Sequence, residues 1–192
     1  MDFKKHLVLA WEMTLRFIVP LVLMTLVMFL ASFLTLGILA PVMMAGYMHA
    51  VLLVIRVGRE PKIGDLFSFM GLFLPLLAFT VLAVLAVSLG LALLVLPGLA
   101  VIVGLAVGAV YMPPLMTDRG LGLIDALMES MRMSFKNNIG EHLVVVLIFW
   151  AIQAIGGSFA IGALFTTPIA VMFLMSVYEE RISAVPVSPN QI

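Results

Sequence analysis

Long stretches without charge constrain this 192-residue chain more than any other feature of its sequence. Three stretches hold no Asp, Glu, Lys or Arg: residues 17–55, 66–117 and 143–178, which are 39, 52 and 36 residues long. One helical crossing of a hydrocarbon core about 30 Å thick takes about 20 residues. Each stretch therefore has the length of two crossings joined by a turn, which would return the chain to the side it left.

The composition agrees with a membrane protein. Apolar residues make up 64% of the chain and charged residues 10%, whereas soluble domains carry about 25% charged residues. Ten basic and ten acidic residues give a net charge of zero, so the chain lacks the basic surface that nucleic-acid binding needs. The absence of cysteine excludes disulfides, thiolate nucleophiles and cysteine-ligated metals.

Residues that interrupt helices lie within each uncharged stretch, where a hairpin has to turn. They occur from Gly37 to Pro41, from Leu96 to Gly98, and from Gly156 to Pro168. The predicted spans are 17–36, 41–57, 72–94, 98–113, 142–161 and 166–179. We therefore expect an all-α bundle of six transmembrane helices in three hairpins. A single membrane domain over residues 1–182 would be followed by a short disordered tail at 183–192.

The basic residues indicate the orientation of this bundle. All ten Lys and Arg residues lie before the first hairpin, in the two return loops or after the last hairpin, and the opposite face has none. Basic loops stay in the cytoplasm. The sequence thus predicts a multi-pass protein of the inner (cytoplasmic) membrane with both termini in the cytoplasm.

A short amphipathic segment precedes each hairpin on the charged side. In the clearest one, residues 123–135, the apolar face consists of Ile124, Leu127, Met128, Met131 and Phe135, and the opposite face carries Asp125, Glu129 and Arg132, followed by Lys136. Residues 3–17 and 65–70 show weaker versions. Such helices lie in the membrane interface. They suggest a threefold internal repeat, although any hairpin would need turn residues of its own.

Several loop and turn motifs resemble those of a known family. These are Gly58–Pro61 followed by Asp65–Phe67, then Leu96–Gly98, then Pro114–Asp118 with Ala126 and Ser130 downstream. They are similar to an uncharacterised family of bacterial multi-pass membrane proteins related to the membrane domain of glycerophosphoryl diester phosphodiesterases. In those relatives the phosphodiesterase chemistry belongs to a separate soluble barrel. The resemblance therefore implies a stand-alone membrane domain with a lipid-linked role, and it transfers no catalytic residue.

The inventory of reactive side chains is short, and we predict no catalytic residue, no bound metal and no cofactor. His49 is the one ionisable side chain deep in a predicted span, which marks it as a functional candidate. It could also simply hydrogen-bond across helices to Gln153 or Tyr47. Two metal alternatives stay open: a divalent cation among the acidic side chains of the second cytoplasmic loop, and copper at the methionines beside His49. The acidic side chains are Asp118, Asp125, Glu129 and Glu141, and the methionines are Met43, Met44 and Met48.

Small residues predict close helix packing. Ala100, Gly104 and Gly108 recur every four residues on the fourth predicted span, and Ser158 with Gly162 repeats this spacing on the fifth. Small residues at this spacing let helix backbones approach closely. We expect them to be used within the monomer rather than between copies.

These features favour a non-enzymatic integral membrane protein that interacts with lipid or serves as an accessory or organising subunit of the membrane. The candidate contacts to lipid headgroups are Arg16, Arg56, Arg59, Lys62 and Arg132, although each could equally be a plain topological anchor. Membrane lipids are the expected partners, with a homo-oligomer or an envelope complex as further options. The alternative function is an oligomeric pore or small-molecule transporter, with its path between subunits or around His49 and Gln153.

Overall fold

The computed structural model describes residues 2–135, 139–158 and 161–183, and over these residues the all-α prediction is confirmed. The helices are α1 (Phe3–Arg16), α2 (Ile18–Leu34), α3 (Ala40–Val57), the short 3₁₀ helices η1 (Ile63–Phe67) and η2 (Met70–Leu72), α4 (Phe73–Leu93), α5 (Val95–Gly108), α6 (Met112–Asp118), α7 (Leu123–Phe135), α8 (Ile139–Gly157) and α9 (Gly162–Ser183). The predicted tail lies outside the described residues from position 184 onward.

Several helices have the length and apolarity of membrane spans. Among the described residues, five segments qualify alone: α3, η1 through α4, α5 through α6, α8 and α9. A sixth is reached if α1 and α2, which are bent by 89° at their junction, are taken together. These are the helices expected of a membrane-spanning protein.

The first turn forms where the breaker residues predicted it. α2 ends before Leu36 and Gly37, which both adopt positive φ angles of 51° and 85°. Pro41 then falls in the first turn of α3. A proline is tolerated there because its missing N–H would have had no partner within the helix.

The other two turns are shifted from their predicted positions. α4 and α5 are separated by Leu94, which is extended, and Pro97 lies in the first turn of α5 rather than in the connection. α9 begins at Gly162, so Pro168 lies inside this helix instead of marking its start. A single proline costs one backbone hydrogen bond, and the packing of neighbouring helices can offset that loss.

The buried core is centred on α3 and α9. Of the 18 consecutive residues that are most apolar in α9, 61% are buried. In the segment that contains α4, only 11% of the corresponding 18 residues are buried. Every residue of α9 from Ala170 to Tyr178 is buried, and α9 packs against α1, α2, α3 and α8. The core therefore lies at one side of the molecule.

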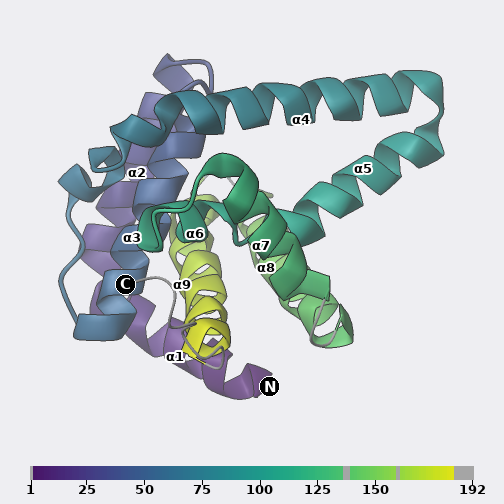
Figure 1. Cartoon of the computed structure of the whole chain (residues 1–192). Helices are drawn as coiled ribbons and strands as arrows, with labels where there is room; N and C mark the ends of the chain where they lie inside the picture. Colours follow the sequence, from purple (N-terminus) through teal and green to yellow (C-terminus); the bar gives the residue numbers. More distant parts are fainter. Residues whose placement is uncertain (1, 136–138, 159–160, 184–192) are drawn as a thin grey trace.

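Helices α4 and α5 form a separate hairpin that extends away from this core (Figure 1). Their backbones cross at Gly90 and Gly98, where a Cβ on Gly90 would lie 3.0 Å from the Cα of Gly98. Most of the outward side chains of this hairpin are exposed and apolar, such as Leu82, Leu85 and Val103. This surface is suited to lipid rather than to water.

Candidate functional site at the shared end of α3, α6 and α9

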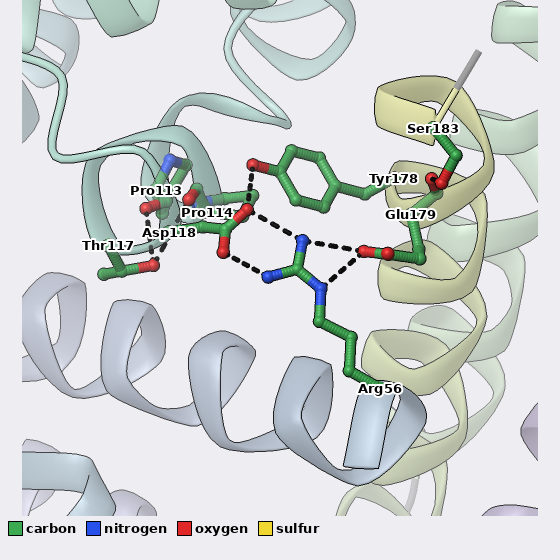
Figure 2. A network of polar contacts seen from close by, with 8 residues as sticks. All are labelled: Arg56, Pro113, Pro114, Thr117, Asp118, Tyr178, Glu179 and Ser183. Carbon is green, nitrogen blue, oxygen red and sulfur yellow. Dashed lines mark hydrogen bonds and ion pairs between the residues drawn. The ribbon is translucent and has the colours of Figure 1, made fainter. Parts of the chain in front are cut away.

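A charged cluster joins three helices at their C-terminal ends (Figure 2). Arg56, in the last turn of α3, donates from Nη1 and Nη2 to the two carboxylate oxygens of Asp118, at 2.5 and 2.9 Å. Its Nε also donates to Oε2 of Glu179 at 2.8 Å. Asp118 ends α6, and Glu179 lies near the end of α9. One guanidinium therefore binds two carboxylates from two different helices.

The convergence of helix ends explains why a cation is needed here. The C-terminal end of a helix carries partial negative charge, and three such ends meet with two carboxylates. Tyr178 adds a further contact, since its hydroxyl donates to Oδ2 of Asp118 at 3.2 Å. The side chain of Asp118 is 10% exposed, against 30% for Arg56. The cluster is thus partly shielded, and its chemistry is that of a clamp between helices.

A second polar contact connects α1 to the same end of α9. Nδ1 of His6 lies 2.9 Å from Oγ of Ser176, and Nε2 lies 2.7 Å from Oε2 of Glu180. The three side-chain types match those of a hydrolytic triad. However, the Ser176 hydroxyl donates to the carbonyl of Phe173 and the residue is only 5% exposed. The arrangement fixes α1 onto α9, and its serine is out of reach of a substrate.

The break between α5 and α6 is a third polar feature, and side chains of α7 and α8 satisfy it. Ser130 donates to the carbonyl of Gly108 at 2.6 Å and accepts from the N–H of Tyr111 at 3.1 Å. Ser134 donates to the carbonyl of Val107, which also accepts from Nε2 of His142 at 2.8 Å. Interrupted helices persist in apolar surroundings only where the freed backbone groups find such partners.

His49 lies on α3 two turns before Arg56, on the side of the charged cluster. Its ring packs edge-on against Phe69, with 4.7 Å between centroids, and its buried Nδ1 has no hydrogen-bond partner among the described residues. The expected bond to Tyr47 or Gln153 is not formed. Tyr47 instead bonds Thr25 at 3.0 Å, and Gln153 accepts from Thr167 at 3.4 Å.

The basic residues predicted to contact lipid headgroups differ in whether a carboxylate of the protein already pairs with them. Arg56 is bound twice, as described above, and Arg59 pairs with Asp65 at 2.6 Å. Arg132 lies 3.6 Å from Glu129 of its own helix and its side chain is 61% exposed. Arg16 and Lys62 are exposed, and no ion pair between described residues includes them. Arg16 covers the ring of Phe17 at 5.4 Å.

The predicted small-residue stripes are used only in part. Gly108 faces Met131, whose side chain would lie 3.3 Å from an added Cβ, whereas a Cβ added to Gly104 would point into open space, and Ala100 is exposed. The prediction that Ser158 and Gly162 share one helix is wrong: α8 ends at Gly157, and Gly162 opens α9. Gly162 instead lies against Gly156 across the turn between these helices.

In the described part of the chain, the acidic side chains do not form the divalent-cation site that the sequence left open. No three His, Asp or Glu side chains gather there in a way that would hold a metal ion. Asp118 is bound to Arg56 and Tyr178, and Met43 and Met48 are buried in the apolar core.

Sequence reasoning assigned no helix-connecting role to several residues that have one: His6, Ser130, Ser134, His142, Ser176, Glu179 and Glu180. A signal for the serines was present, since Ala126, Ser130 and Ser134 recur every four residues on one face of a helix. Glu180, the partner of His6, is 174 residues away along the chain, and Asp118 and Glu179, the partners of Arg56, are 62 and 123 residues away, so no local pattern points to them.

Comparison of the chain with protein-family models, curated proteins and solved structures finds no match. The family resemblance drawn from the loop motifs therefore stays a prediction.

Proposed function

We propose that this chain is a non-enzymatic, lipid-interacting protein of the bacterial cytoplasmic membrane, with six spans in three hairpins and both termini in the cytoplasm. The observation that carries the proposal is the charged cluster of Arg56, Asp118 and Glu179. Its members end α3, α6 and α9, and in the proposed topology each of these helices returns its hairpin to the cytoplasm. A side-by-side meeting of the three ends is what paired crossings require.

The other polar connections support the same arrangement. His6 binds Glu180, and Arg181 donates to the carbonyl of Met133 at 3.0 Å, so α1 and α7 both attach at the end of α9 that holds the cluster. Charged groups are costly in hydrocarbon and gather where water or headgroups can solvate them. The apolar surfaces of α4 and α5 would then face acyl chains.

Lipid interaction is proposed because the exposed surface offers both acyl-chain and headgroup contacts. Among the predicted headgroup contacts, Arg16 and Lys62 are the best placed, since carboxylates already occupy Arg56 and Arg59. A basic residue near an anionic leaflet contributes about 1 kcal/mol of attraction. Two pairs of polar side chains within the apolar helices, Thr25–Tyr47 and Gln153–Thr167, bind each other, which is a packing role rather than that of a pore lining.

Cysteine accessibility tests the topology. The chain has no cysteine, so single replacements need no prior removal. We expect Glu60→Cys and Arg119→Cys to react with an impermeant maleimide from the cytoplasmic side only. Ile38→Cys, Leu96→Cys and Ser158→Cys should react only from the other side. Opposite sidedness of Glu60→Cys and Arg119→Cys would contradict the paired crossings.

Native mass spectrometry tests the lipid role. Protein released from nanodiscs that contain phosphatidylglycerol should carry bound anionic lipid as a monomer or small oligomer. The combined Arg16→Gln and Lys62→Gln variant should retain several-fold less of it, whereas Glu12→Gln with Glu60→Gln should not lose any. Equal retention by both variants would overturn the headgroup contacts, and a large ring without lipid would favour the pore alternative.

A further inference from the structure

Helices α1 and α7 divide their surfaces in the same way. In α1 the buried face is His6, Ala10 and Thr14, and in α7 it is Ala126, Ser130 and Ser134. Both faces repeat every four residues and contain only small or hydrogen-bonding side chains. Some large apolar side chains flank these faces and pack partly against the core, such as Met13 of α1 and Leu127 of α7, and most of the others are exposed.

The apolar stripes of the two helices are exposed and occupy equivalent positions. In α1, Val8, Trp11 and Leu15 are 46%, 55% and 48% exposed, and in α7 the residues at the same places, Met128, Met131 and Phe135, are 57%, 43% and 51% exposed. Both stripes lie roughly opposite the buried face of their helix.

Around the axis of each helix, a stripe of charged residues lies between the apolar stripe and the buried face, on the same side in α1 and in α7. It contains Lys5, Glu12 and Arg16 in α1, and Asp125, Glu129 and Arg132 in α7. Each helix therefore has one face for the protein, one largely exposed apolar face and one charged face. On the apolar face of α7, Met131 also lies against Gly108 of α5. A division into three such faces is expected of a helix at the boundary between protein, acyl chains and water.

The orientation of α1 fits this boundary. It is bent by 89° from α2, so if α2, which is 17 residues long, forms the sixth crossing by itself, α1 runs along the membrane surface. Exposed apolar residues of α2, such as Val19 and Leu23, follow the stripe of α1 along the chain. The stripe of α7 likewise precedes Leu143 and Leu147 of α8.

Two consecutive residues of α9 attach α1 and α7 at the same height along the axis of α9. Glu180 binds His6 of α1, and Arg181 binds the backbone of Met133 in α7. Both attachments lie at the end of α9 that holds the charged cluster, so both stripes would meet the same leaflet.

We propose that α1 and α7 are an equivalent pair of in-plane anchors, whose exposed apolar stripes insert into the headgroup–acyl boundary of the cytoplasmic leaflet. This inference rests on the proposed function, because it takes α2 and α8 as membrane spans. Insertion of such a helix reaches about 5–10 Å into the boundary region. The charged stripes would then face the headgroups and water.

The two tryptophans of the chain provide the test, because one lies on the α1 stripe and the other in α8. A Trp150→Phe variant retains Trp11 as its only tryptophan. In vesicles that contain phosphatidylglycerol, we expect lipids brominated high on the acyl chain to quench Trp11 strongly and acrylamide to quench it weakly. The triple variant Trp11→Phe, Trp150→Phe, Met131→Trp should behave the same way, since position 131 is the equivalent place on α7.

A matched control moves the probe by one residue. The variant Trp11→Phe, Glu12→Trp, Trp150→Phe places tryptophan on the charged stripe, where acrylamide should quench it several-fold more strongly. Acrylamide quenching of Trp11 as strong as in this control would overturn the proposal. Protection of Trp11 from both acrylamide and brominated lipid would also overturn it, because another protein surface would then cover the stripe.

The Trp11→Phe variant separates this inference from the proposed function. It leaves Trp150, 53% exposed in α8, which should be quenched best by bromine deep in the acyl chains if α8 crosses the membrane. Deep quenching of Trp150 with a water-exposed Trp11 would refute only the in-plane anchors. A water-exposed Trp150 would refute the crossing of α8 as well.

Discussion

Arg56 shows how a single residue can gain its role from contacts that lie far along the chain. It stands at the end of a predicted span, where basic residues commonly mark the cytoplasmic side. The structure gives it two carboxylate partners from other helices, at Asp118 and Glu179. Its interaction energy should therefore depend on these partners more than on its position at the membrane surface.

A double-mutant cycle measures this dependence. Arg56→Gln, Asp118→Asn and the double variant should give a coupling energy of about 1–2 kcal/mol in the free energy of unfolding in mixed micelles. The matched pair Arg132→Gln and Glu129→Gln, which is exposed and 3.6 Å apart, should couple by less than about 0.5 kcal/mol. Equal coupling in the two cycles would show that partial burial adds nothing to the Arg56 cluster.

Glycines of α3 and α5 offer a contrast in packing at the same scale. A Cβ on Gly46 would lie 2.5 Å from the carbonyl oxygen of Asp65 and 2.8 Å from that of Leu66, so η1 docks there only because no side chain intervenes. Gly46→Ala should lower the free energy of unfolding by about 1–3 kcal/mol. Gly104→Ala, which has open space, should leave it unchanged or slightly raised. Thermal unfolding in detergent compares the two, and an equal effect would refute the close approach of η1.

At the scale of elements, α7 shows what amphipathic periodicity can and cannot decide. Periodicity correctly predicted a helix over residues 123–135 with apolar and charged faces. It did not indicate which face meets the protein, and the face that does so is the small one with Ser130 and Ser134. Those hydroxyls are needed because α5 breaks before α6 and frees backbone groups beneath α7.

Removal of one hydroxyl tests this account of the break. Ser130→Ala would leave the Gly108 carbonyl and the Tyr111 N–H without their present partner. We expect the free energy of unfolding to fall by about 1–3 kcal/mol. Ser158→Ala is the control, since this exposed hydroxyl bonds the carbonyl of Ala154 one turn earlier within the same helix end. If Ser130→Ala lowered the free energy of unfolding as little as the control does, the backbone groups of Gly108 and Tyr111 would have other hydrogen-bond partners.

The whole molecule is asymmetric: a buried core around α3 and α9 lies beside the apolar hairpin of α4 and α5 (Figure 1). In a membrane, most side chains of the α4–α5 hairpin would contact lipid, whereas most side chains of α9 contact other helices of the protein. The same substitution should therefore have different consequences in the two regions.

Enlarging an alanine in each region measures this asymmetry. Ala170→Leu adds volume to a fully buried site in α9 and should cost about 1–3 kcal/mol of unfolding free energy. Ala86→Leu lies on the exposed surface of α4 and should change it by less than about 0.5 kcal/mol. Equal costs, determined by unfolding in mixed micelles, would imply that another protein surface packs on α4.

The helical class and the approximate extent of most apolar helices could be predicted from the sequence, because both follow from local hydrophobicity, charge and helix-breaking residues. The sequence located the first turn at Gly37 and Pro41. The predicted position of the second turn was wrong by a few residues, because a proline such as Pro97 fits the first turn of a helix as well as the connection before it.

The contacts between polar groups of different helices could not be predicted in this way, because they depend on how the helices pack. Whether Arg56 contacts a headgroup or Asp118, and whether His6 contacts water or Glu180, depends on the packing of helices that are distant along the chain. Hydrophobic patterning is local and can be read residue by residue. Ion pairs between helices, and hydrogen bonds from a side chain to the backbone of another helix, need two surfaces that are correctly aligned. That alignment exists only after the helices have packed.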